Sequence, residues 1–165
     1  MRVRFLALAL LLAAPTLAGC GFTPLYASPG VSSGLSTIET VAPQGRTGFL
    51  LGEALDDALV RDPSKPASWK LKIDLKEVRT PRGRLIDATS SRYELVLTAD
   101  WQLVDATTGA VALQGETSTE VTFDRTDQPY AGIVANQDAQ SRAASELARK
   151  IQLQVAVWMS RGAGR

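Results

Sequence analysis

The feature that most constrains the fold is a strict alternation of apolar and charged residues in one eight-residue run. Odd positions are apolar and even positions are charged in the stretch Trp69-Lys70-Leu71-Lys72-Ile73-Asp74-Leu75-Lys76. Because successive side chains of a β-strand point to opposite faces of the sheet, this period of two predicts a strand with one face on a core and the other in water. The rest of the chain must therefore cover the apolar face.

Two later segments keep the same phase and predict two more strands. The first runs from Tyr93 to Leu103, and the second runs from Val111 to Phe123 with threonines in its middle, which places it nearer an edge of the sheet. The loop between them, 105–109, has the composition of a hairpin turn. The alternation slips after Lys76, so the arginine-rich stretch 79–84 is predicted to be a turn. A looser alternation over 35–41 predicts a short first strand.

Periodicity of three and four predicts two helices. Thr47 is expected to cap the first, whose apolar stripe ends at Leu59 and which Pro63 stops. The second is expected from about Ala131 to Ser160, with the stripe Leu147, Ile151, Val155 and Trp158. The order β-α-β-β-β-α predicts an α+β fold, a two-layer sandwich in which two helices pack on one face of a four-stranded sheet.

The start of the chain has the features of an export signal. A basic segment, Met1–Arg4, precedes ten apolar residues, Phe5–Ala14, and the sequence Leu17-Ala18-Gly19-Cys20 follows. Ten apolar residues are fewer than the roughly 20 that a membrane-spanning helix needs. The pattern predicts a lipoprotein signal peptide over residues 1–19 and lipidation of Cys20. Two or three acyl chains would attach the protein to a membrane permanently, and Gly21 favours the outer membrane.

The remaining chain divides into a tether and one domain. Residues 20–34 are rich in Ser, Gly and Pro and are expected to form a lipidated flexible tether, and residues 35–165 are long enough for a single α+β domain. Phe22, Leu25 and Tyr26 are unusual in a linker. They are expected to contact lipid headgroups or another protein, although a tether in which they have no role is the alternative.

Composition argues against an enzyme. The chain has no histidine, and its single cysteine is the predicted lipidation site, which excludes Cys-His and Ser-His nucleophile systems and an internal disulfide. No phosphate-binding glycine loop and no metal-ligand spacing is present, so we expect no cofactor, no metal and no catalysis. The near balance of 18 basic and 17 acidic residues gives no indication of nucleic-acid binding.

The segment Cys20-Gly21-Phe22-Thr23-Pro24-Leu25-Tyr26 resembles the CGFxPLY opening of the LPS-assembly lipoproteins, the LptE family. The segment 130–151 is similar to the C-terminal helix of that family. The resemblance implies an outer-membrane lipoprotein that binds, plugs and helps assemble the LptD-like β-barrel translocon inserting lipopolysaccharide into the outer leaflet. Its domain would lie on the periplasmic side or within the barrel lumen.

One basic cluster is a candidate binding site for lipopolysaccharide. It consists of Arg79, Arg82, Arg84 and Arg92. Arginine forks match phosphate geometry, and lipid A is phosphorylated, but a basic turn that only aids solubility is an equal alternative. Two other functions also fit the anchor: an auxiliary lipoprotein of an ABC-type lipid transport system, and a lipoprotein activator of periplasmic cell-wall synthases.

Overall fold

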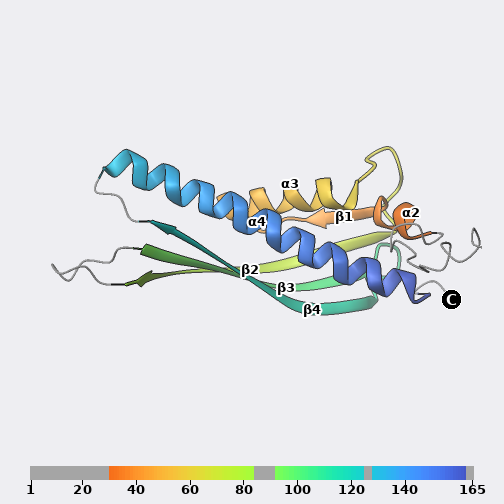
Figure 1. The fold of residues 1–165 in the computed structure, drawn as a ribbon. Helices are drawn as coiled ribbons and strands as arrows, with labels where there is room; N and C mark the ends of the chain where they lie inside the picture. Colours follow the sequence, from red (N-terminus) through yellow and green to blue (C-terminus); the bar gives the residue numbers. More distant parts are fainter. Residues whose placement is uncertain (1–29, 84–91, 125–127, 163–165) are drawn as a thin grey trace, which may run out of the picture.

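The computed structural model describes residues 30–83, 92–124 and 128–162, and shows helices packed on one face of a four-stranded sheet (Figure 1). Its elements are α2 (Val31–Leu35), β1 (Ile38–Val41), α3 (Arg46–Leu59), β2 (Trp69–Arg82), β3 (Arg92–Asp105), β4 (Val111–Asp124) and α4 (Pro129–Ser160). The predicted fold class is confirmed, with α2 added before the first strand. The predicted signal peptide, Cys20, residues 20–29 of the tether and Arg84 lie outside the described residues.

The sheet has the order β1-β2-β3-β4. β1 pairs with β2 in parallel, with Ile38 opposite Trp69, and α3 makes the crossover between them. β2, β3 and β4 are antiparallel, and residues of one parity stay on one face across all three strands up to a register shift between β3 and β4 at Leu103/Val104. β4 lies at an edge, as its threonines predicted.

The core lies between the odd-numbered face of the sheet and the helices. Its largest fully buried side chains include Leu51, Leu55 and Leu59 of α3, Leu71, Leu95, Leu97 and Leu103 of the sheet, and Leu147 and Ile151 of α4. Five buried alanines of α4, at 139, 143, 144, 148 and 156, let this helix approach the sheet closely. The predicted stripes are thus confirmed, except that Trp158 is only partly buried.

The predicted turn at Arg79 is wrong, because β2 continues to Arg82, which pairs with Arg92. The alternation of apolar residues along β2 ends at Glu77, because the residues of α3 and α4 that face the strand at this point are polar. Glu77 accepts hydrogen bonds from the Thr47 hydroxyl at 2.6 Å and from Gln140 Nε2 at 3.0 Å. The strand is therefore held there by polar contacts to α3 and α4 rather than by apolar burial.

The beginnings of two elements also differ from prediction. Thr47 does not cap α3: the N-cap is Gly45, and the Thr47 hydroxyl is used by Glu77 instead. The first strand begins at Ile38 rather than Leu35, because residues 31–35 form α2 and bury Val31 and Leu35 in the core. The domain therefore begins inside the segment 20–34 that was expected to be tether.

Candidate functional site

Three of the predicted arginines lie at the end of the sheet where β2 ends and β3 begins, here called the distal end. Arg82 stands directly opposite Arg92, whereas Arg79 stands opposite the buried Leu95. Because parity decides the face of a strand, Arg79 lies on the helix side, and Arg82 and Arg92 lie on the open face. The structure therefore divides the predicted cluster between two faces of the sheet.

On the open face, both arginines are paired with carboxylates. Arg82 donates from Nε and Nη2 to the two oxygens of Glu94, each at 2.7 Å, and Arg92 Nε donates to Asp124 at 3.0 Å. The hydrogen bonds from Arg82 hold the pKa of Glu94 below its ordinary value. The positive charges of Arg82 and Arg92 are therefore largely compensated by the carboxylates of Glu94 and Asp124. A phosphate that binds to Arg82 would have to compete with a carboxylate that already accepts two hydrogen bonds.

On the helix side, Arg79 lines a groove between the end of β2, the start of α3 and the start of α4, here called the distal groove. Its volume is about 530 Å³, and it is lined by Arg46, Arg79, Pro129, Gly132, Ile133, Asn136, Gln137 and Gln140. The Arg79 guanidinium lies 5.3 Å from the centre of the Tyr93 ring, and its Nη1 donates to Asn136 Oδ1 at 3.4 Å. The ring and the amide hold this guanidinium in place.

The distal groove combines cations, amides and an apolar rim. Arg46 and Arg79 contribute two positive charges, and three amide side chains add further hydrogen-bonding groups. On the first turns of α4, Tyr130 is 79% exposed, Ile133 56% and Val134 47%. Such a groove can bind the anionic groups of an amphiphile while apolar parts lie against the rim.

Sequence reasoning missed Arg46, Asn136 and Gln140. Arg46 is isolated in the sequence and stands 33 residues before Arg79, so no spacing connects the two. The one available signal was the slip of the alternation at Glu77, which indicated that polar partners replace the core at this point. Only the packing of α3 and α4 beyond the core brings these side chains together.

Neither a metal centre nor a membrane-crossing helix emerges from the part of the chain that the structure describes. In the ranges 30–83, 92–124 and 128–162, no three His, Cys, Asp or Glu side chains are grouped to hold a metal ion. None of the helices in those ranges is both long and apolar enough to span a bilayer.

Comparison with known proteins gives one family match and several structural relatives. The family model described as LptE, lipopolysaccharide-assembly, matches residues 35–155. A crystal structure of a protein from Caulobacter crescentus CB15, assigned as a lipoprotein, is 52% identical, covers 80% of this chain and 96% of its own, and has a TM-score of 0.71. Among curated proteins, no sequence matches significantly.

Two more distant structures share the fold. A minor lipoprotein from Acinetobacter baumannii is 16% identical, with 73% of this chain and 88% of its own covered and a TM-score of 0.53. The solution structure of lipoprotein B from Nitrosomonas europaea is 15% identical, with coverages of 76% and 87% and a TM-score of 0.51. At this identity the two structures support the architecture alone.

Proposed function

Because this chain belongs to the LptE family of lipopolysaccharide-assembly proteins, we propose that it binds, plugs and helps assemble the β-barrel translocon that inserts lipopolysaccharide into the outer leaflet. The match over residues 35–155 and the 52% identical relative confirm the family resemblance inferred from the sequence. The family consists of non-enzymatic outer-membrane lipoproteins that associate with LptD and lipopolysaccharide. Plugging and assembly are the more specific roles proposed here for this chain.

The open face of the sheet is the observation that carries the proposal. The described helices all lie on the other face (Figure 1), and β2, β3 and β4 each have 14 residues, about 46 Å at about 3.3 Å per residue. The even-numbered charged and amide side chains on this face include Lys70, Lys72, Asp74, Glu94, Asp100, Gln102, Gln114, Glu116 and Glu120. A long surface of charged and amide groups suits the polar lumen wall of a large barrel.

The size of the domain also fits this role. A single domain of this length has a radius of gyration of about 15 Å, and barrels of about 22 strands have a lumen wide enough to need a plug. The domain could therefore lie at least partly within such a barrel, with its open face against the wall.

Site-specific photocrosslinking in cells tests the proposal. A photoreactive residue at Lys72, Asp100 or Glu116, on the open face, should capture an outer-membrane barrel protein, and depletion of the lipoprotein should leave that barrel misassembled. A matched control is Glu53, which is exposed on α3 on the opposite side of the molecule. Crosslinks only to an inner-membrane ABC transporter, or only to a cell-wall synthase, would replace the proposal with one of the two alternative functions.

The distal groove is the best candidate for direct contact with lipopolysaccharide. Arg46 and Arg79 would bind the phosphates of lipid A, and the rim at Ile133 would lie against its apolar part. Arg82 and Arg92 would contribute less to this binding, because they are already paired with the carboxylates of Glu94 and Asp124. This assignment narrows the predicted arginine cluster to Arg79 and adds Arg46.

Charge reversal distinguishes these arginines. Arg79→Glu should weaken binding of purified lipopolysaccharide by about ten- to a hundredfold, since a hydrogen bond to a charged group contributes about 1.5–3 kcal/mol. Arg82→Glu should weaken it less. Arg161→Glu, an exposed position at the other end of α4, is the control for a change in net charge. Equal affinity of Arg79→Glu and the control would contradict the assignment.

A further inference from the structure

An apolar cavity lies at the end of the domain where the chain enters at residue 30, here called the tethered end. Its volume is about 420 Å³, and it is lined by Ser32, Leu35, Ser36, Ala58, Leu59, Val60 and Gln152. These residues come from α2 and the segment after it, from the end of α3 and from α4. None of them is charged, and the volume is within the range of about 300–1,000 Å³ of ligand pockets. The cavity therefore suits an uncharged apolar group.

Val60, on the lining of this cavity, is both strained and exposed. Its backbone is left-handed, with φ 52° and ψ 49°, and its side chain is 74% exposed. A β-branched residue rarely adopts this conformation, which glycine or asparagine usually occupies at the end of a helix. A valine here costs backbone energy and presents an isopropyl group to solvent. Both features are explained if an apolar partner covers it.

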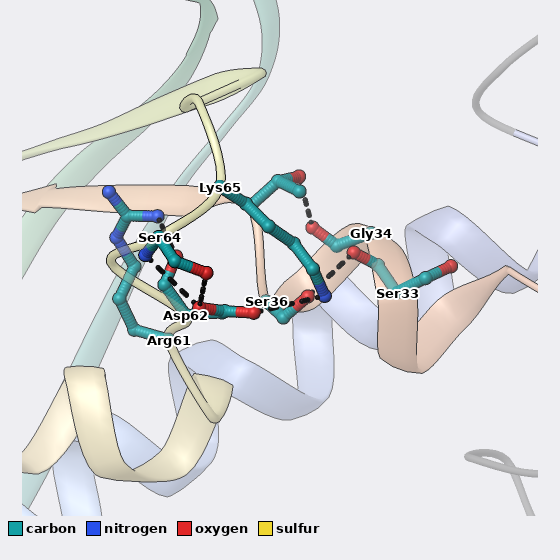
Figure 2. A network of polar contacts seen from close by, with 8 residues as sticks. Ser33, Gly34, Ser36, Arg61, Asp62, Ser64 and Lys65 are labelled. Atoms are coloured by element: carbon teal, nitrogen blue, oxygen red, sulfur yellow. Dashed lines mark hydrogen bonds and ion pairs between the residues drawn. The ribbon is translucent and has the colours of Figure 1, made fainter.

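A polar network beside the cavity joins the end of α2 to the segment after α3 (Figure 2). The Asp62 N–H donates to the Ser36 carbonyl at 3.0 Å, which fastens the segment after α3 to the end of α2. The Asp62 carboxylate accepts from the Ser64 hydroxyl at 2.6 Å and pairs with Lys65 at 3.2 Å, and these contacts lower the pKa of Asp62. The cavity is thus preformed, with its rim fixed by α2 and the segment after α3.

We propose that this cavity receives the chain's own segment Phe22-Thr23-Pro24-Leu25-Tyr26. Only three residues lie between Tyr26 and Gly30, so the four steps from one to the other reach up to about 14 Å at about 3.5 Å per residue, and Ser32 already lines the cavity. The segment is uncharged and has three large apolar side chains, which matches the uncharged lining. Because the connection is short, the segment has a local concentration of about millimolar and outcompetes most partners in trans.

Docking would shorten the tether. If Cys20 is lipidated, a free tether from Cys20 to Gly30 could extend about 35 Å, whereas a docked segment leaves only Gly21 between the anchor and Phe22. The tethered end would then be held against the membrane with a fixed orientation. The docking itself depends neither on lipidation nor on the proposed role in lipopolysaccharide assembly, so the two proposals can fail separately.

Disulfide trapping in the membrane-anchored full chain tests the docking. Leu25→Cys combined with Ala58→Cys should form an intramolecular disulfide, which requires Cα atoms about 4.4–6.8 Å apart. The matched control combines Leu25→Cys with Val111→Cys, which is half exposed at the start of β4, beside the loop whose Ala106 N–H donates to Ser68, which in turn donates to Thr37 just after α2. The first pair should close at least tenfold faster. Leu25→Cys alone controls for pairing with Cys20.

A second variant separates docking from folding. Val60→Gly accepts the left-handed backbone without strain, so the domain stays folded. It also removes the apolar side chain that the segment would cover, and trapping should slow by about tenfold. Equal closing rates for the Ala58 and Val111 pairs, or capture of another protein by Leu25→Cys in place of the intramolecular bond, would overturn the proposal.

Discussion

The surroundings of Trp101, on β3, explain why the facing part of β4 has small and polar residues. Its indole is buried, and Nε1 donates to Thr117 Oγ1 at 2.9 Å, while Gln154 of α4 donates to the same oxygen at 3.0 Å. Gly115 leaves room for the ring, because a Cβ there would lie 2.8 Å from Trp101 Cζ2. The small and polar residues of β4 therefore leave room for Trp101 and accept its hydrogen bond, in addition to indicating an edge strand.

Gly115→Ala should destabilise the domain by about 1–3 kcal/mol, since the added methyl group overpacks the Trp101 ring and displaces it from Thr117. Urea denaturation followed by tryptophan fluorescence measures the free energy of unfolding. Ser118→Ala, an exposed change on the same strand, should stay within about 0.5 kcal/mol. A Gly115→Ala loss as small as that of the control would mean that the ring can shift without cost.

Protonation of Glu94 is expected to contribute to the loss of stability of the domain in acid. Two hydrogen bonds from Arg82 lower its pKa from 4.5 in the folded state. A lowered folded-state pKa gives stability that is present above the unfolded-state pKa and is lost as pH falls through the folded-state pKa. Unfolding free energy should thus fall below about pH 4.5.

The variant Glu94→Gln should make this loss shallower, and Arg82→Gln should do the same because it removes the partner. Urea titrations between about pH 5 and pH 3 measure the slope. Some slope should remain, since hydrogen bonds from Ser64, Thr108 and Arg149 lower the pKa of Asp62, Asp105 and Glu146 in the same direction. An unchanged slope in both variants would show that the Arg82–Glu94 pair is absent in solution.

Among the elements, α2 depends on its packing. A helix of five residues that includes two serines and a glycine is not stable alone. Val31 and Leu35 are buried, and Gly34 lies against Met159 of α4, where a Cβ would be 3.0 Å from the sulfur. These contacts to distant residues explain why α2 could not be predicted from the local sequence.

A chain that begins at Ser28 keeps α2 and should be monomeric and melt cooperatively, because it contains every buried apolar residue of the part that the structure describes. Leu35→Ala in that chain should lower the free energy of unfolding by about 2–5 kcal/mol. Circular dichroism during thermal and urea unfolding measures both. Ser33→Ala, exposed on the same helix, is the control. An equal stability of Leu35→Ala and the control would mean that α2 is not part of the folded domain.

The open face carries a row of three carboxylates across its strands. Asp74, Asp100 and Glu116 are register partners on β2, β3 and β4. Like charges directly opposite one another destabilise a sheet by about 0.2–1 kcal/mol. Glu116 faces Asp100, and its diagonal neighbours on β3, Thr98 and Gln102, offer no positive charge. Lys72 and Lys76 of β2 lie diagonal to Asp100, so the unfavourable part of the row in the isolated domain is the Asp100–Glu116 pair.

Glu116→Gln should accordingly stabilise the isolated domain by a few tenths of a kcal/mol, and the gain should shrink as salt screens the repulsion. Gln114→Glu, which adds a carboxylate diagonal to Asp100, should have the opposite sign. Urea denaturation at low and high salt measures both. A loss of stability in Glu116→Gln would indicate that this carboxylate has a favourable partner within the domain.

The strands and helices could largely be predicted from the sequence because apolar periodicity reports burial against the core. The prediction failed at Glu77, since its partners Thr47 and Gln140 are 30 and 63 residues away and leave no periodic signal. For the same reason, the distal groove could not be predicted from the sequence. Once β2 is known to continue, parity alone puts Arg79 and Arg82 on opposite faces, but no pattern connects Arg79 with Arg46.

The part of the molecule that the structure describes is elongated, and α4 spans its length (Figure 1). Its 32 residues correspond to about 48 Å at about 1.5 Å per residue. The first turns of α4 line the distal groove, and its last turns lie beside α2 at the tethered end. The segment that leads from Cys20 thus joins the described domain at residue 30, at the end opposite the arginines of the groove.

Membrane attachment and lipopolysaccharide binding should therefore be separable. Cys20→Ala should leave an uncleaved or mislocalised precursor that a palmitate analogue does not label, because nothing remains to lipidate and Leu17 prevents ordinary cleavage. Arg46→Glu with Arg79→Glu should keep the label and the membrane fraction of the natural chain, yet lose lipopolysaccharide binding. If Cys20→Ala is still labelled and membrane-bound, the anchor lies elsewhere. If the double arginine variant leaves the membrane, the groove contributes to attachment and the two ends do not act independently.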